Sequence, residues 1–345
     1  MAGRVLEALQ HRRMTLGPAG REQGDGKAQG FRHWQLAWDD SGTAWLLLNR
    51  QGSSVNTLNA ETFDELSDIL NNLTEEPPAA LVIRSAKPTG FCAGADVGEF
   101  ANLDRKEPVQ EALDRAHAVL DRLEGLAFPT IAVIHGDCLG AGLELALACD
   151  FRIAIDGAKL GFPEVRLGLH PGLGGTVRLT GLIDPTEAMT LMLTGKSAHT
   201  AKAADLGLVD AVTQERHVRN GVRAAAAGEL KGAKPGLKAT ALNSLAAREI
   251  ASRQMRSKAE EKARAEHYPA PFKLIDLWRE HGGDSAAMRK AETESFAELV
   301  LSETAQNLIR VFFLREGLKR EGSAAAEVRH VHVIGAGAMG GDIAG

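Results

Sequence analysis

The sequence predicts an α/β fold with a mainly parallel sheet, followed by a segment that is entirely helical. Short apolar runs alternate with amphipathic helical stretches between residues 34 and 212, as expected when crossover helices connect parallel strands. From about residue 215 to Arg320 polar helical stretches dominate, and no clear strand pattern returns before Val331. The 345 residues are enough for about two compact units, or for one large domain with an appendage.

The first predicted elements are a hairpin and a helix. Two strand-like runs at residues 34–38 and 44–49 are separated by the turn signal at residues 39–42, which predicts a hairpin. Asn59 can cap a helix over residues 60–73. Apolar residues recur in this helix at helical spacing, namely Phe63, Leu66, Ile69, Leu70 and Leu73.

The alternation of strands and helices then continues to about residue 215. The pattern predicts buried strands at residues 81–83, 131–134 and 151–155, helices at 107–123 and 201–206, and a short strand at 208–212. We therefore expect a flexible leader at residues 1–30, a first domain at residues 31–215 and a helical extension or linker at residues 216–326.

The composition is typical of a folded globular protein and excludes several classes of function. Hydrophobic residues make up 44% and charged residues 25% of the chain. The 40 Lys and Arg against 45 Asp and Glu give a formal charge of -5, which argues against nucleic acid as the main partner. No apolar run approaches the roughly 20 residues that span a bilayer, and residues 1–30 lack the apolar stretch of a signal peptide. We expect a cytoplasmic protein, in keeping with an odd number of cysteines (Cys92, Cys138 and Cys149).

Two glutamates stand out in the segment from residue 131 to residue 179. Glu144 follows a Gly-Ala-Gly turn at the start of an otherwise apolar helix, where the helix dipole favours a carboxylate. Glu164 follows Pro163 inside the apolar run at residues 160–169. Two carboxyl groups in one apolar pocket would have raised proton affinity, which general acid/base catalysis requires. A purely structural interpretation, with each carboxylate satisfied locally, stays open at this point.

Two turns rich in small residues are a second feature. Residues 91–96 follow the strand predicted at 81–83, and residues 140–142 follow the strand predicted at 131–134. Small residues let a ligand approach main-chain amides. The two turns could therefore direct two N–H groups at one oxygen, as in an oxyanion hole, or they could serve packing alone.

At these residues the sequence resembles the crotonase superfamily, especially the enoyl-CoA hydratase part of multifunctional fatty-acid oxidation enzymes. The resemblance rests on the motifs at residues 91–96, 135–150 and 162–179, which occur in the family's order and spacing. It extends from about Trp34 to Val212 and continues more loosely beyond. It implies a crotonase-type spiral of ββα units followed by a helical linker.

The resemblance also implies a set of site residues. Glu144 and Glu164 would be the catalytic pair, and the backbone N–H groups of Ala95 and Ala141 would form the oxyanion hole. Further contacts to an acyl-CoA substrate would come from Ser54, Val55, Ala93, Gly94, Asp96, Gly140 and Gly172. Two positions depart from the family pattern. Ala141 replaces a glycine found in many members and could narrow the acyl pocket, and Gly98 replaces a lysine that helps hold CoA phosphates in some hydratases.

The reaction implied is syn addition of water to a trans-2-enoyl-CoA in fatty-acid β-oxidation, which needs no metal or redox cofactor. The resemblance further implies isomerisation of 3-enoyl-CoA to 2-enoyl-CoA through Glu164 as a side activity. Two alternatives remain open. One is another crotonase reaction such as thioester hydrolysis, and the other is a non-catalytic scaffold, including RNA-binding relatives and subunits that dock a thiolase. Net acidity argues against RNA.

The last residues resemble the start of an NAD-binding Rossmann domain, which we place at residues 327–345. Gly335, Gly337 and Gly340 follow a strand-like run and match the dinucleotide-binding fingerprint. The acidic residue expected about 20 positions later is missing, so we expect no NAD binding by this chain. The resemblance implies a longer parent protein that is also a 3-hydroxyacyl-CoA dehydrogenase using NAD, with a thiolase subunit as a partner.

Overall fold

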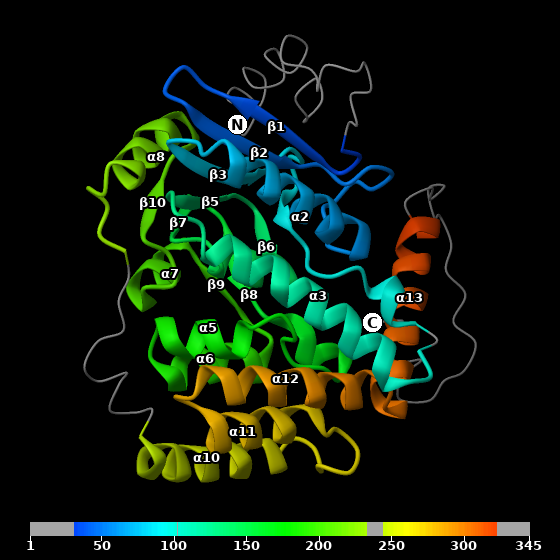
Figure 1. Ribbon diagram of the computed structural model, residues 1–345. Helices are drawn as coiled ribbons and strands as arrows, with labels where there is room; N and C mark the ends of the chain where they lie inside the picture. The colour runs from blue at the N-terminus through cyan, green and yellow to red at the C-terminus, as the bar shows by residue number, and fades with distance from the viewer. Residues whose placement is uncertain (1–30, 102, 233–243, 323–345) are drawn as a thin grey trace, which may run out of the picture.

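The computed structural model describes residues 31–101, 103–232 and 244–322, which form two sheets surrounded by helices (Figure 1). The α/β architecture predicted from the sequence is present, and the helical extension follows the strand-containing part. The predicted leader at residues 1–30 and the dinucleotide fingerprint with Gly335, Gly337 and Gly340 lie outside the described residues.

A six-stranded sheet has the strand order β1-β2-β3-β5-β7-β10. β1 and β2 form the predicted antiparallel hairpin, with Trp34 opposite Leu48, and every other neighbouring pair is parallel. The central strands are buried along their whole length, as expected for parallel strands covered on both faces. The bounds are β1 (Trp34–Trp38), β2 (Thr43–Leu48), β3 (Ala80–Ser85), β5 (Thr130–Ile134), β7 (Phe151–Ile155) and β10 (Ala211–Thr213).

A second sheet in the order β4-β6-β8-β9 was missed by the sequence analysis. Its strands are β4 (Gly90–Cys92), β6 (Asp137–Leu139), β8 (Lys159–Gly161) and β9 (Ser197–His199). Three residues are too few to show an alternating pattern, and these strands are defined by distant partners. Cys138 of β6, for example, lies opposite Cys92 in β4 and Leu160 in β8. β4 and β6 lead into the two turns rich in small residues.

One predicted strand is shifted along the chain. Residues 208–210, which were expected to begin a strand, form a bend, and only β10 pairs with β7. The Asp210 side chain accepts a hydrogen bond of 2.7 Å from the backbone N–H of Arg152. The backbone N–H of Arg152 in β7 thus donates to a side-chain oxygen of Asp210 and not to the carbonyl oxygen of a paired strand.

Helices cover both faces of the six-stranded sheet. α2 (Ala60–Glu75) and α3 (Lys106–Glu124) share a core cluster with Leu46, whereas α8 (Val218–Ala226) packs on the opposite face with Trp45. Neighbouring residues of β2 therefore enter different cores, as the alternation of side chains along a strand requires. The predicted cap of α2 is present, because the Asn59 side chain accepts a hydrogen bond from the backbone N–H of Thr62 and the Thr62 hydroxyl accepts one from that of Asn59.

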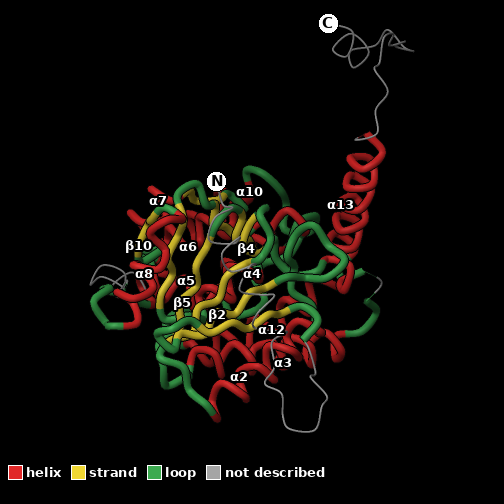
Figure 2. The backbone as a smooth tube through the Cα atoms, turned by 90° about the horizontal axis from the view of Figure 1, so that it is seen from above, coloured by secondary structure: helices red, strands yellow, loops and turns green. Residues whose placement is uncertain are grey.

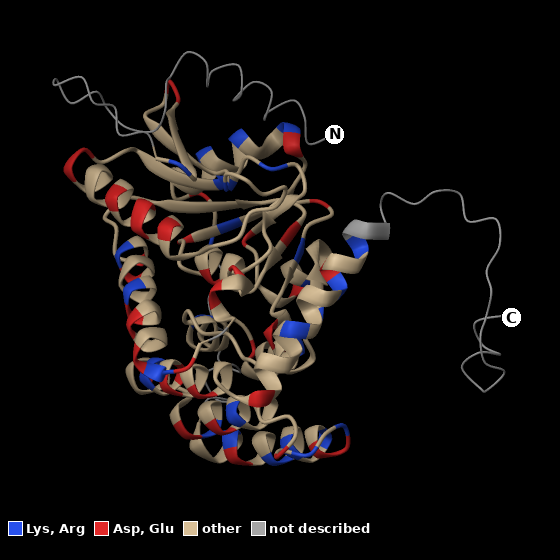
Figure 3. Ribbon diagram, turned by 90° about the vertical axis from the view of Figure 1, so that its right-hand side faces the viewer, with Lys and Arg blue, Asp and Glu red and all other residues tan. Residues whose placement is uncertain are grey.

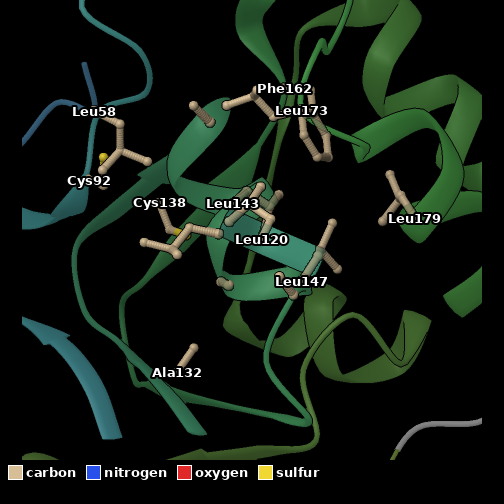
Figure 4. Packing of buried hydrophobic residues seen from close by; sticks show 14 of the residues in the cluster. Leu58, Cys92, Leu120, Ala132, Cys138, Leu143, Leu147, Phe162, Leu173 and Leu179 are labelled. Carbon is tan, nitrogen blue, oxygen red and sulfur yellow. The ribbon is translucent and has the colours of Figure 1, made fainter. Parts of the chain in front are cut away.

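Shorter helices connect the remaining strands. α4 (Ala141–Leu147) is buried throughout, and Figure 4 shows its Leu143 and Leu147 among the apolar side chains of the main core. The others are α5 (Gly175–Leu182), α6 (Pro185–Thr194) and α7 (Thr200–Leu206), with short 3₁₀ helices at η1 (Val97–Phe100), η2 (Pro163–Leu167) and η3 (Glu215–His217).

The helical extension was expected to begin at residue 216, but α8 packs on the six-stranded sheet and belongs to the strand-containing part. The described helices that remain in the extension are α10 (Leu245–Glu260), α11 (Ala270–His281), α12 (Ser285–Val300) and α13 (Glu303–Gly322). Trp278 of α11 and Phe296 of α12 belong to the core cluster that contains Leu46, so the extension shares that core with the strand-containing part. Figure 1 shows α12, α11 and α10 as successive rows below α5 and α6, and Figure 2 shows α13 projecting from the rest of the chain.

Ion pairs also connect the extension to the strand-containing part. Lys106 of α3 and Lys273 of α11 both contact Glu298 of α12, at 3.0 and 2.8 Å. In the view of Figure 3, basic and acidic residues are intermixed along the helices.

Among the described residues, none of the helices has the length and apolar character needed to cross a membrane.

Candidate active site

A largely apolar cavity of about 550 Å³ lies where the two small-residue turns meet the helical extension. Its polar end is formed by the turns after β4 and β6 and by η2. Its apolar wall includes Phe100 of η1, Leu113 of α3, Phe296 of α12 and Phe312 of α13. The strand-containing part and the extension therefore line one cavity together.

The two small-residue turns touch each other at this cavity. Gly94 has a φ of 116°, and a Cβ added to it would lie 3.4 Å from the Leu139 carbonyl oxygen and 4.0 Å from the Ala141 nitrogen. A Cβ on Gly142 would lie 2.5 Å from the Cβ of Cys92, which leaves no room for any side chain there. Glycine at both positions brings the backbone of one turn against the other.

The amides of Ala95 and Ala141 line the cavity and are free to donate. In the part of the chain that the structure describes, neither N–H donates a hydrogen bond to a protein acceptor. For Ala141 the reason is geometric, because it is the first residue of α4 and first-turn amides have no acceptor within the helix. The geometry thus places two unpaired donors at the ends of neighbouring strands.

Glu144 lies on α4 and is 2% exposed. Its Oε1 atom accepts hydrogen bonds from the backbone N–H groups of Leu173 and Gly175, each at 2.7 Å. Burial raises the pKa of Glu144 well above its usual value, and the nearby carboxyl groups of Glu292 and Glu164 raise it further. The two amides act in the opposite direction, because they favour the carboxylate form.

Glu164 provides another carboxyl group at the polar end of the cavity and lies on η2, directly after Pro163. Its Oε1 atom lies against the second turn (residues 140–142), since a Cβ on Gly140 would be 2.8 Å away. Its Oε2 atom is buried and has no hydrogen-bond partner among the residues that the structure describes. Burial, with a smaller contribution from Glu292, raises the pKa of Glu164 to about 8. Glu164 is therefore protonated at neutral pH and able to donate a proton.

A third buried carboxyl group, Glu292, was missed by the sequence analysis. It lies on α12 and accepts hydrogen bonds from the backbone N–H groups of Gly174 at 2.6 Å and Thr176 at 3.2 Å, and from the Thr176 hydroxyl. Burial raises its pKa to about 7. One signal in the sequence could have revealed it, because Glu292 stands between Met288 and Phe296 at a spacing of four, on the apolar side of a helix.

The remaining predicted contact residues divide into two groups. Ala93, Gly94, Gly140 and Gly172 line the cavity together with the residues described above. Ser54, Val55 and Asp96 do not, although all three lie in the described part of the chain. Asp96 instead caps η1 by accepting a hydrogen bond from the Gly98 N–H at 3.0 Å, and it pairs with Arg50 at 2.7 Å.

Two other residues with reactive side chains are held in structural roles. Cys92 lies beside the first turn but is buried, and burial raises the pKa of its thiol to about 12, which keeps it from forming a nucleophilic thiolate. His170 hydrogen-bonds the Pro171 carbonyl oxygen at 2.7 Å and the Ser295 hydroxyl at 2.9 Å. Among the described residues, no group of three or more His, Cys, Asp or Glu side chains is arranged to hold a metal ion.

Comparison with known proteins relates this geometry to a family. The sequence model described as enoyl-CoA hydratase/isomerase matches residues 40–270. Curated relatives include the fatty acid oxidation complex subunits alpha of Aliivibrio fischeri, 36% identical over 325 residues, and of Shewanella putrefaciens, 38% identical over 327 residues. Each alignment covers 90% of this chain but 46% of the relative, so the chain spans about half the length of the curated relatives it matches.

Solved structures with the same fold include two acyl-CoA enzymes. An enoyl-CoA hydratase from Bacillus anthracis is 26% identical with a TM-score of 0.53, covering 84% of this chain and 96% of that one. A carnitinyl-CoA dehydratase from Mycobacterium thermoresistibile has a TM-score of 0.63 at 18% identity, covering 86% and 94%, and supports the fold alone. The predicted crotonase-type α/β fold is confirmed. With a family match over more than half of its length, the chain belongs to the enoyl-CoA hydratase/isomerase family.

Proposed function

We propose that this chain is an enoyl-CoA hydratase, which adds water to the double bond of a trans-2-enoyl-CoA in fatty-acid β-oxidation. The observation that carries the proposal is the combination, in one cavity, of two unpaired amides with two buried carboxyl groups of unequal hydrogen bonding. Membership of the enoyl-CoA hydratase/isomerase family supports it, as do relatives named for fatty acid oxidation.

In the proposed mechanism the thioester oxygen lies between the N–H groups of Ala95 and Ala141. Negative charge develops on this oxygen as water attacks the β carbon and an enolate forms. Donors that are already in place stabilise that charge without reorganisation, and a single such donor can contribute about 3 kcal/mol. Because Ala141 begins α4, the partial positive charge of the helix N-terminus adds to the effect.

The two carboxyl groups differ in the way that acid and base roles require. Glu144 accepts two amide hydrogen bonds on Oε1, which oppose the rise of its pKa caused by burial and leave Oε2 to take a proton from the attacking water. Glu164 has an unpaired Oε2 and a pKa of about 8, so its acid form can protonate the α carbon. The roles reverse in dehydration. Amide donors and acid/base groups supply every step, so we propose that hydration needs neither a metal nor a redox cofactor.

An isomerase activity is the second candidate, and the unpaired oxygen of Glu164 favours it. A single carboxyl group that exchanges its proton with either end of an enolate converts a 3-enoyl-CoA to a 2-enoyl-CoA. Hydration remains the main proposal because isomerisation leaves Glu144 without a role.

The test is the loss of the absorbance of crotonyl-CoA as purified protein hydrates it. We expect Glu144→Gln and Glu164→Gln each to reduce kcat by at least about a hundredfold, the usual contribution of a general acid or base. Glu298→Gln is the matched control, since Glu298 lies on the surface of α12 in an ion pair with Lys273. A double variant at Glu144 and Glu164 that retains full activity would contradict the proposal.

We further propose a cytoplasmic location and an acyl-CoA thioester as the substrate. The curated relatives are named as subunits of a complex, and we propose that the longer parent protein pairs with a thiolase subunit and carries the NAD-dependent dehydrogenase. We would express the longer protein together with a thiolase and purify the longer protein. Co-purification of the unsubstituted thiolase, but not of a thiolase that carries surface substitutions, would support that partner.

A further inference from the structure

Four successive backbone amides at the start of α5 are shared between two buried carboxylates. Leu173 and Gly175 donate to Glu144, each at 2.7 Å, whereas Gly174 and Thr176 donate to Glu292, at 2.6 and 3.2 Å. The donors therefore alternate along residues 173–176, which we call the shared turn. Any movement of this turn away from one carboxylate also changes the hydrogen bonds of the other.

The second carboxylate comes from a part of the chain beyond the family match. That match ends at residue 270, whereas Glu292 lies on α12 and is fully buried. Phe296, one helical turn further along α12, fills the space that a Cβ on Gly172 would occupy, at 2.6 Å. The Phe296 ring also stacks edge-on against His170, with centroids 6.1 Å apart. α12 thus holds the shared turn by hydrogen bonds and the segment before it by an apolar contact.

We propose that Glu292 is a positioning residue for hydration: its hydrogen bonds to Gly174 and Thr176 hold the shared turn so that Glu144 is aimed into the cavity, and they place a third carboxyl group beside the catalytic pair. This inference rests on the proposed hydratase function. It also assigns the helical extension a direct part in the active site.

The charged groups around Glu292 do not cancel the repulsion between its carboxyl group and those of Glu144 and Glu164. His117 of α3 lies 3.8 Å away, but burial lowers its pKa to about 4, so it is neutral at working pH. Arg178 of α5 is a cation that lowers the pKa of Glu292, but its guanidinium group also pairs with Asp121 and Glu124. Arg289, on α12 itself, pairs with Asp121. The carboxyl groups of Glu144 and Glu164 face Glu292 from α4 and η2, and both have their pKa raised by it.

Removing the charge of Glu292 therefore has a predictable sign. An ionised Glu292 disfavours a second and third negative charge nearby, which raises the pKa of Glu144 and of Glu164. In Glu292→Gln this repulsion is absent, so both groups ionise at lower pH. The acid limb of the rate profile, which requires ionised Glu144, and the basic limb, which requires protonated Glu164, both move to lower pH.

The experiment compares the wild type, Glu292→Gln and the control Glu298→Gln by kcat/KM for crotonyl-CoA across the pH range. We expect Glu292→Gln to lose about tenfold to a hundredfold in rate, since a displacement of about 1 Å in a catalytic group can have an effect of that order. We expect its whole profile to shift to lower pH, whereas the profile of Glu298→Gln stays in place. A reduced rate with an unshifted profile, or an unchanged rate, would overturn the inference.

A second measurement separates this inference from the proposed function. In protein labelled with ¹³C at glutamate carboxyl groups, NMR titration follows Glu144 directly, and we expect it to titrate at lower pH in Glu292→Gln than in the wild type. If the wild type does not hydrate crotonyl-CoA, the proposed function fails, and the titration alone then decides whether Glu292 controls Glu144. Equal titration in both proteins would overturn the inference.

A milder variant covers the case in which Glu292→Gln does not fold. Thr176→Val removes the hydroxyl that donates to Glu292, and this hydrogen bond lowers the pKa of Glu292. Without it Glu292 stays neutral to a higher pH, so we expect a smaller shift of the rate profile in the same direction. An unshifted profile in a folded Thr176→Val would count against the inference.

Discussion

The strand-containing part and the helical extension contribute to the same cavity in different ways. Residues of the former supply chemistry from the ends of strands, where Ala95 and Ala141 present unpaired amides and Glu144 and Glu164 enter from short helices. The extension presents apolar side chains to the cavity together with the charged Arg315, Glu316 and Lys319 of α13, and it adds one buried carboxyl group behind the cavity. The comparison teaches that recognisable motifs place the reacting groups, while helices without such motifs shape the space and the electrostatics around them.

The largest expected effect comes from separating the two turns in the strand-containing part. In Gly142→Ala the new methyl would lie 2.5 Å from the Cβ of Cys92, so the turns must move apart and the amides of Ala95 and Ala141 lose their alignment. We expect a loss of kcat of about a hundredfold or more. Crotonyl-CoA hydration is the measurement.

Gly181→Ala is the matched control for that change. Gly181 lies in α5, and a Cβ there would meet no atom within 4 Å. Replacing glycine by alanine in a helix without a clash is neutral or slightly stabilising. Equal activity in the two variants would show that contact between the turns is not required.

The corresponding change in the extension is expected to affect stability and specificity more than chemistry. Phe296 is 4% exposed, lines the cavity and stacks edge-on against Phe100 with centroids 5.7 Å apart. Phe296→Ala should lower the free energy of unfolding by about 3 to 5 kcal/mol and raise the relative rate for longer enoyl-CoA chains, because it enlarges the apolar end of the cavity. Urea unfolding and the ratio of kcat/KM between long and short substrates measure the two effects.

Phe313→Ala serves as the control for this prediction, because Phe313 of α13 is 43% exposed. An unchanged substrate ratio in a folded Phe296→Ala would mean that the extension does not shape the acyl site.

The pH dependence of the rate tests the role of Glu164. The pKa of Glu164 is raised to about 8, so its acid form is lost above that pH and hydration should fall by about tenfold per pH unit. The same shift affects folding. A carboxyl group whose pKa is raised on folding stabilises the folded state below its ordinary value of 4.5, and this contribution is lost as the pH rises through about 8. A rate that stays constant from pH 7 to pH 10 would remove Glu164 from the role of acid.

The smallest expected effect concerns Ala141, which lines the cavity at the polar end and is 4% exposed. Replacing it with glycine removes one methyl and leaves the amide donor in place. We expect the ratio of rates between short and long enoyl-CoA substrates to change by about tenfold at most, the lower range for one methylene in a pocket. An unchanged ratio would show that this methyl does not limit the acyl site.

Local patterns were sufficient to predict much of this protein. The turn signal at residues 39–42, the cap at Asn59 and the apolar periodicities located the hairpin and the long helices, because each depends on residues that are close in the chain. The motifs around Glu144 and Glu164 likewise located two acidic groups that lie at the polar end of the cavity.

Contacts between distant segments decided the rest. Strands β4, β6, β8 and β9 exist because each pairs with a segment far along the chain, and three residues carry no periodicity of their own. The meeting of the two turns depends on Gly142 lying against Cys92. Glu292 lies buried beside Glu144 because α12 packs against α5 in the folded chain. The first backbone amides of α5 need acceptors, and the Glu292 carboxyl group supplies one.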